Sequence, residues 1–117
     1  MKRLLLSFSL ILMLSPARAE TITPVEAPQH VGQNVTVEGL VSEVHHAASG
    51  KVTFVDMGGH YPNNTFTAVI FADEASKFPN VDSLEGKTID VSGQISLYNH
   101  RPEIILNDPA QIKMKRP

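Results

Sequence analysis

Between residues 35 and 42 the sequence reads VTVEGLVS, and its alternation of apolar and polar residues constrains the fold more than any other feature. A period of two is typical of a β-strand with one buried face. Gly39 lies inside this strand and predicts a bulge or a sharp bend. A small barrel needs such a bend where one strand crosses both of its sheets. The segment therefore predicts a long, bent first strand.

Further strand patterns follow along the chain. They cover residues 52–57, 66–72, 87–97 and 103–106. Loops are expected at 45–51, 58–64 and 98–102, where turn residues gather. Between the third and fourth strands, residues 73–78 predict one or two helical turns, with Asp73 as N-cap and Pro79 as the stop. Five short strands with this helix indicate an all-β fold, the OB-fold, which is a five-stranded Greek-key barrel. An open β-sandwich is the alternative.

Residues 1–19 predict a secretory signal peptide. Lys2 and Arg3 precede an apolar run over residues 4–14, and an A-x-A cleavage pattern occupies residues 17–19. The alternative is a membrane anchor, but a span of about 30 Å of hydrocarbon needs roughly 20 apolar residues. We therefore expect a periplasmic or secreted protein that has no membrane attachment after cleavage.

Cleavage would change the charge balance. The whole chain has 10 basic and 12 acidic residues, a formal charge of −2. The predicted mature chain keeps 7 basic residues against 12 acidic ones, a formal charge of −5. This domain lacks the broad basic surface expected of a phosphate-binding protein, so any such interface must be local. The chain contains no cysteine, which excludes disulfides and thiolate metal sites.

The predicted mature chain has three parts. Residues 20–30 are short, polar and contain two prolines, which indicates a flexible entry segment or one turn of helix. Residues 31–112 form the OB-fold domain. Residues 113–117 form a basic tail that we expect to be frayed.

Two segments carry a resemblance to known proteins. The sequences HVGQNVTVEGLV (residues 30–41) and GKVTFVDM (residues 50–57) resemble OB-fold domains of the tRNA-anticodon-binding type. The segments YPN (61–63), FTAVIF (66–71) and the stretch 98–112 resemble small exported bacterial OB-fold proteins described as nucleic-acid-binding. His100 departs from that pattern, which has glycine before Arg-Pro. OB-folds bind oligonucleotides, oligosaccharides and proteins, so function must be argued from the site.

The expected binding surface is the face of the second and third strands. If Thr53, Val55 and Met57 point inward, Phe54 points outward. An inward Thr67 would likewise leave Phe66 outward. Exposed rings stack on bases, and the resemblance implies this role for Phe54. The alternative is that both rings lie in the core or under loops.

Further candidate residues lie in the loops. Arg101 can bind a phosphate and Tyr98 can stack on a base; the alternative for Arg101 is a surface ion pair with Glu103. Lys51 ends the first loop, where a phosphate could pass, and is otherwise a solvated lysine. Tyr61 either stacks on a ligand or packs on its neighbouring proline.

The sequence predicts neither a metal site nor an enzyme. No pair among His45, His46, His60 and His100 has a recognised ligand spacing, so no metal or cofactor is expected. Neither a nucleophile elbow nor a P-loop is present. The first interpretation is therefore a non-enzymatic protein that binds single-stranded DNA or RNA. The alternative is a cell-envelope module that binds a protein or an oligosaccharide.

Overall fold

A computed structural model describes residues 19–115 of the chain. The predicted signal peptide over residues 1–19 therefore lies outside the described residues, except for Ala19. Within residues 19–115, no helix is both long enough and apolar enough to cross a membrane.

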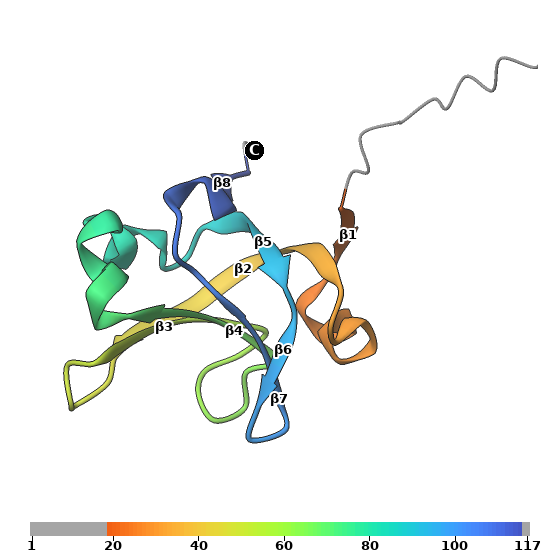
Figure 1. The fold of residues 1–117 in the computed structure, drawn as a ribbon, viewed down its shortest axis with the longest axis horizontal. Coiled ribbons are helices and arrows are strands. Elements are labelled where there is room, and N and C mark those ends of the chain that lie inside the picture. The colour runs from red at the N-terminus through yellow and green to blue at the C-terminus, as the bar shows by residue number, and fades with distance from the viewer. Residues whose placement is uncertain (1–18, 116–117) are drawn as a thin grey trace, which may run out of the picture.

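The regular structure of the described chain is mostly β-strand, with four short 3₁₀ helices (Figure 1). The strands are β1 (Glu20–Ile22), β2 (Asn34–His46), β3 (Val52–Met57), β4 (Phe66–Phe71), β5 (Thr88–Gln94), β6 (Ser96–Tyr98), β7 (Arg101–Ile105) and β8 (Ile112–Met114). The helices are η1 (Pro24–His30), η2 (Ala72–Lys77), η3 (Val81–Leu84) and η4 (Pro109–Gln111). The all-β prediction is confirmed, but the predicted count of five strands is wrong. The strands β1 and β8 were not predicted, and the predicted fourth strand over residues 87–97 is divided into β5 and β6; β1, β6 and β8 have three residues each.

Strand β2 joins the two halves of the sheet. The strand order is β6-β7-β4-β3-β2-β5-β8, with β1 parallel to β2 at the side. The first half of β2, from Asn34 to Leu40, pairs with β5, and the second half pairs with β3. The register shifts between Val41 and Glu43, so the irregularity lies at Ser42 and not at the predicted Gly39.

Gly39 has a different role from the predicted one. A Cβ atom at this position would lie 2.7 Å from Cγ of Pro24 and 3.2 Å from Sδ of Met57. Glycine therefore allows η1 to pack closely on β2. The register shift of the strand lies three residues further along.

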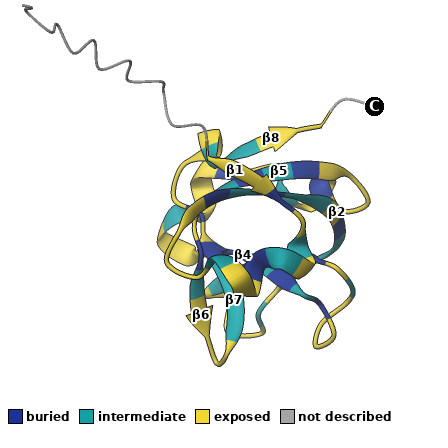
Figure 2. Cartoon of the chain, turned by 90° about the vertical axis from the view of Figure 1, so that its right-hand side faces the viewer, coloured by how far each residue is buried: buried dark blue, intermediate teal, exposed yellow. Residues whose placement is uncertain are grey.

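The core lies between the two halves of the coiled sheet. Figure 2 shows β1, β2 and β5 facing β4 and β7, with buried segments turned toward one another. The largest fully buried side chains are Phe66, Met57, Ile70, Ile89, Ile95, Ile104 and Leu106. Apolar burial of this kind contributes roughly 25 cal/mol per Å² and is the main source of stability in a chain without disulfides.

The two ends of the domain are more structured than predicted. Of the two alternatives for residues 20–30, the helical turn is present as η1 and the flexible segment is wrong, because β1 pairs with β2 and Ala27 of η1 is fully buried in the core. The tail from residue 113 is not frayed throughout, because Lys113 and Met114 belong to β8, which pairs with β5. Residues 116 and 117 lie outside the described chain.

The helical turns predicted over residues 73–78 are present, but they are 3₁₀ in type. The helix η2 begins after Phe71 as N-cap, and not at the predicted Asp73.

The pairing of β3 with β4 corrects the predicted position of Phe66. Phe66 lies opposite Met57 and Ala68 opposite Val55, so these four side chains share the inward face. Phe66 is 1% exposed and cannot stack on a ligand. Thr67 lies opposite Asp56, and Val69 opposite Phe54, on the outward face. The prediction failed because FTAVIF is apolar on both faces and has no period that could fix its orientation.

Replacement of Phe66 by alanine should destabilise the domain by about 3–5 kcal/mol, the cost of removing a buried aromatic side chain. Phe71→Ala is the matched control, because Phe71 ends the same strand and is 42% exposed; its effect should stay below about 1 kcal/mol. Urea unfolding of both variants measures the difference. Equal losses in the free energy of unfolding for the two variants would contradict the inward position of Phe66.

Candidate functional site

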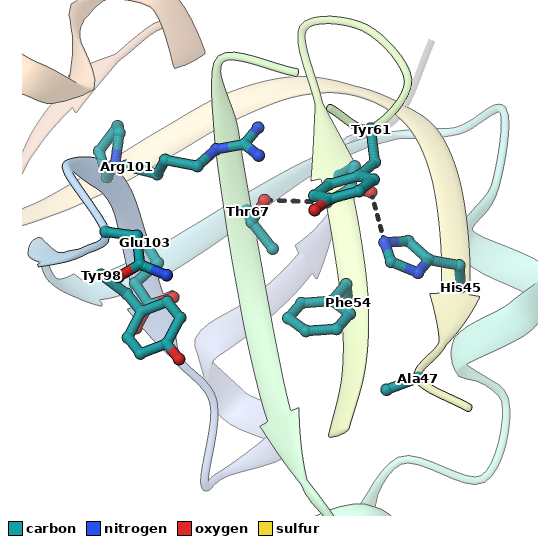
Figure 3. A pocket seen from close by; sticks show the side chains of 11 residues that line it. His45, Ala47, Phe54, Tyr61, Thr67, Tyr98, Arg101 and Glu103 are labelled. Atoms are coloured by element: carbon teal, nitrogen blue, oxygen red, sulfur yellow. Dashed lines mark hydrogen bonds and ion pairs between the residues drawn. The ribbon is translucent and has the colours of Figure 1, made fainter. Parts of the chain in front are cut away.

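A cavity of about 310 Å³ opens on the outer face of β3, β4 and β7. Its lining includes Phe54, Tyr61, Tyr98 and Arg101, which are four of the six predicted site residues (Figure 3). The residues come from β3, from the β3–β4 loop, from β6 and from the start of β7. The register of the sheet thus brings together positions that are up to 47 residues apart in the chain.

Aromatic rings form one side of the cavity. His45 of β2 lies directly opposite Phe54 of β3, and the two rings stack with centroids 4.8 Å apart. The ring of Tyr61 is tilted toward His45 at 5.7 Å. Tyr98 lines the other side of the cavity and is 66% exposed. The cavity can therefore present ring faces to a flat apolar ligand.

Arg101 connects β7 to the β3–β4 loop. Its Nη2 donates hydrogen bonds to the carbonyl oxygens of Pro62, at 3.0 Å, and Asn64, at 3.1 Å, and to Oδ1 of Asn64. Its Cζ lies 5.2 Å from the centroid of the Tyr61 ring, a cation–π arrangement. The alternative of an ion pair with Glu103 is wrong, since Arg101 bonds to the loop instead.

Asp56 lies under the cavity and is almost completely buried. Its Oδ1 accepts hydrogen bonds from Oγ1 of Thr67, at 2.8 Å, and from Nδ2 of Asn64, at 3.2 Å. Its Oδ2 lies 3.0 Å from Nε2 of His45. Burial raises the pKa of Asp56, because the charged form loses water, and the hydrogen bond from Thr67 and the charges of His45 and Arg101 oppose the rise.

Glu103 adds a second carboxyl group to the cavity. It lies on β7 opposite Thr67 and is partly buried. Within residues 19–115 it has no ion-pair partner. Burial alone raises the pKa of Glu103. The cavity therefore combines aromatic rings, one guanidinium and two carboxyl groups.

Two predicted residues lie elsewhere. Phe66 is in the core, as described above. Lys51 is exposed in the connection between β2 and β3 and does not line the cavity. The sequence reasoning missed His45, Asn64, Thr67 and Glu103. Only the strand register could have found His45 and Thr67, because it places them opposite Phe54 and Asp56.

The turn between β6 and β7 accounts for the unusual His100. Tyr98 pairs with Arg101, so only two residues connect the strands. Asn99 and His100 have φ values of 49° and 63°, as a two-residue hairpin of type I′ requires at both central positions. Glycine suits such a position best, and His100 adopts the same conformation here. Tyr98 and Arg101 belong to the strands and not to the predicted loop.

Four of the five histidines, His30, His45, His46 and His60, lie within 4.0 Å of a carboxylate. His46 lies 2.8 Å from Asp82, and His60 lies 3.3 Å from Glu43. Among the residues that the structure describes, no group of three or more metal-ligating side chains is close enough to hold a metal ion.

No protein-family model and no curated protein matches the chain. Among solved structures, the OBody AM1L10 bound to hen egg-white lysozyme aligns at 18% identity with a TM-score of 0.61, covering 88% of this chain and 98% of that one. The asparaginyl-tRNA synthetase of Entamoeba histolytica aligns at 17% identity and 0.54, covering 82% of this chain and 23% of the synthetase. The aspartyl-tRNA synthetase of the same organism aligns at 12% and 0.52, covering 88% of this chain and 23% of the synthetase.

These similarities show the fold, which is of the OB type. The chain spans less than a quarter of the length of these two synthetases. The prediction made from the sequence is thus confirmed as an all-β fold of the OB type. The predicted five-stranded barrel is not matched, because the described strands form an eight-stranded open sheet in which β6 and β8 lie at opposite ends of the strand order.

Glu103→Gln should raise the free energy of unfolding at about pH 7. Because burial raises the pKa of Glu103 in the folded state, the folded state binds more protons between the unfolded and folded pKa values. Stability is therefore lost as the pH rises through this window, and glutamine removes the loss. The gain should shrink as the pH falls through the ordinary carboxyl range, near pH 4.

Urea unfolding at about pH 7 and about pH 4 measures this difference. Asp73→Asn, at an exposed carboxylate of η2, is the control. A gain for Glu103→Gln that is the same at both pH values would contradict the burial effect.

Proposed function

We propose that this OB-fold domain binds single-stranded nucleic acid, DNA or RNA, on the outer face of β3, β4 and β7, without catalysing a reaction. One observation carries the proposal: Phe54, Tyr61, Tyr98 and Arg101 line the same cavity. Rings beside a guanidinium are the combination that single-strand-binding proteins use, because bases stack on rings and phosphates bind cations.

The geometry assigns a role to each group. The Phe54 ring, stacked on His45, offers its other face to a base. Such stacking contributes about 1–3 kcal/mol per base and tolerates any sequence. Arg101 would bind a phosphate, since charge-assisted hydrogen bonds are strong and directional. Lys51 would contact the sugar-phosphate backbone of the nucleic acid only where the bound nucleic-acid strand extends beyond the cavity.

The comparisons support a nucleic-acid partner in general, because two of the similar structures are tRNA synthetases. The formal charge of −5 for the predicted mature chain predicts modest affinity, because few phosphates can be neutralised. We further propose, on the basis of the predicted signal peptide, that the protein acts in the periplasm or outside the cell.

A protein ligand is the second candidate. The OBody of similar fold is bound to lysozyme, so an OB-type scaffold of this size is able to bind a protein. The acidic balance of the chain and the two carboxyl groups in the cavity favour a ligand that carries positive charge. An oligosaccharide has no comparable observation in its favour.

Fluorescence anisotropy with labelled single-stranded DNA and RNA tests the proposal. Phe54→Ala should weaken binding by about 1–3 kcal/mol, roughly five- to hundredfold, through loss of stacking. Phe71→Ala is the matched control, because it is a partly exposed phenylalanine outside the cavity and should bind like the wild type. Urea unfolding establishes that both variants are folded.

Binding should also weaken when the salt concentration rises from roughly 50 to 200 mM, as phosphate contacts require. If the wild-type protein shows no binding to either nucleic acid at low salt, the proposed function is wrong and the protein-binding candidate takes its place.

A further inference from the structure

Asn64 occupies the centre of the polar network under the cavity. It precedes β4 in the β3–β4 loop and is only 8% exposed. Its Oδ1 accepts a hydrogen bond from Nη2 of Arg101. Its Nδ2 donates to Oδ1 of Asp56 at 3.2 Å, to the Phe66 carbonyl at 3.2 Å and to Oγ1 of Thr67 at 2.6 Å. One side chain thus links β3, β4 and β7.

The chemistry of the neighbours requires an amide at this position. A guanidinium has donors only, whereas an ionised carboxylate and a carbonyl have acceptors only. The amide of Asn64 meets both kinds of partner, with its oxygen toward Arg101 and its nitrogen toward Asp56. An aspartate would direct a second carboxylate at Asp56, and an alanine would leave buried polar groups without partners.

The same contacts leave part of Arg101 available. All of its hydrogen bonds within the described chain use Nη2, with acceptors from Pro62 and Asn64. The N–H groups of Nε and Nη1 have no protein partner among residues 19–115. An anchored arginine loses little further freedom when a ligand binds, because its planar group is already held in place.

We propose that Asn64 is the positioning residue of the site. It holds the guanidinium of Arg101 beside the Tyr61 ring. The Nε and Nη1 groups then remain available for a phosphate of the nucleic-acid strand whose base stacks on Phe54. The inference rests on the proposed function and extends it to a residue that does not line the cavity.

The test uses labelled oligothymidylate and the measured slope of log K against log salt concentration. Each lost phosphate contact lowers the magnitude of this slope by about 0.7 for a single strand. Asn64→Ala should bind about tenfold more weakly at low salt, as expected for a charge-assisted hydrogen bond, and its slope should fall by this amount. Arg101→Gln should give the same fall, and the double variant should lose nothing more.

Asn63→Ala is the matched control. Asn63 is the neighbouring asparagine, is exposed, and has no side-chain hydrogen bond within the described chain. It should keep the wild-type affinity and slope. A residue that only stabilised the fold would change the unfolding midpoint and leave the salt slope of the folded protein unchanged.

If Asn64→Ala does not fold, Arg101→Lys tests whether the remaining N–H groups of Arg101 bind a phosphate. The three N–H groups of a lysine equal the three acceptors that Pro62 and Asn64 offer here, so none would remain for a phosphate. We expect this variant to lose as much affinity as Arg101→Gln, and wild-type affinity in Arg101→Lys would overturn the inference.

The possible failures differ. Absence of oligothymidylate binding by the wild-type protein would overturn the proposed function and this inference together. Wild-type binding combined with an unchanged slope in folded Asn64→Ala would overturn only the role of Asn64.

Discussion

The antiparallel pairing of β2 with two different strands is the constraint on which the rest of the structure depends. Because β2 bonds to β5 over its first half and to β3 over its second, the sheet must coil around one core. The register shift at Ser42 then determines which residues of β2 face outward. It places His45 opposite Phe54, and the pairing of β3 with β4 places Thr67 opposite Asp56. The candidate site is a consequence of these registers.

A second constraint follows from the burial of Asp56. A buried carboxylate is costly unless it is paired and hydrogen-bonded. Thr67 and Asn64 supply its hydrogen bonds, and His45 lies at ion-pair distance. Asn64 also accepts a hydrogen bond from Arg101, so the cost of burying one charge is offset by a network that joins β2, β3, the β3–β4 loop, β4 and β7. A network of this kind is rigid when its members are satisfied. The network here is satisfied except at Oδ2 of Asp56 and Nε2 of His45, which lie 3.0 Å apart, so it restrains the residues that line the cavity.

The sequence predicted the features that depend on a local residue pattern. It failed for features that are determined by contacts between residues distant in the chain. The outward side of Phe54 was predicted correctly, but only on the assumption that Thr53, Val55 and Met57 point inward, which their burial bears out. The inward side of Phe66 was not, because its strand is apolar on both faces and only its register with β3 orients it. The bulge was assigned to Gly39 because glycine often marks one, yet the close approach of Pro24 explains this glycine. No local pattern distinguishes Asn64 from Asn63.

The charge of the protein limits how such a site can act. With a formal charge of −5 for the predicted mature chain, the domain as a whole repels a polyanion, and long-range attraction contributes little to association. Under the proposed function, affinity must come from short-range contacts, which are the ring faces and the anchored guanidinium of Arg101. Rings within a cavity reach bases only when these are unpaired, because the bases of a duplex are stacked on one another. A duplex could make only the phosphate contacts, and these are few because the domain has little positive charge. The same shortage of positive charge that weakens binding would therefore favour single strands over duplexes.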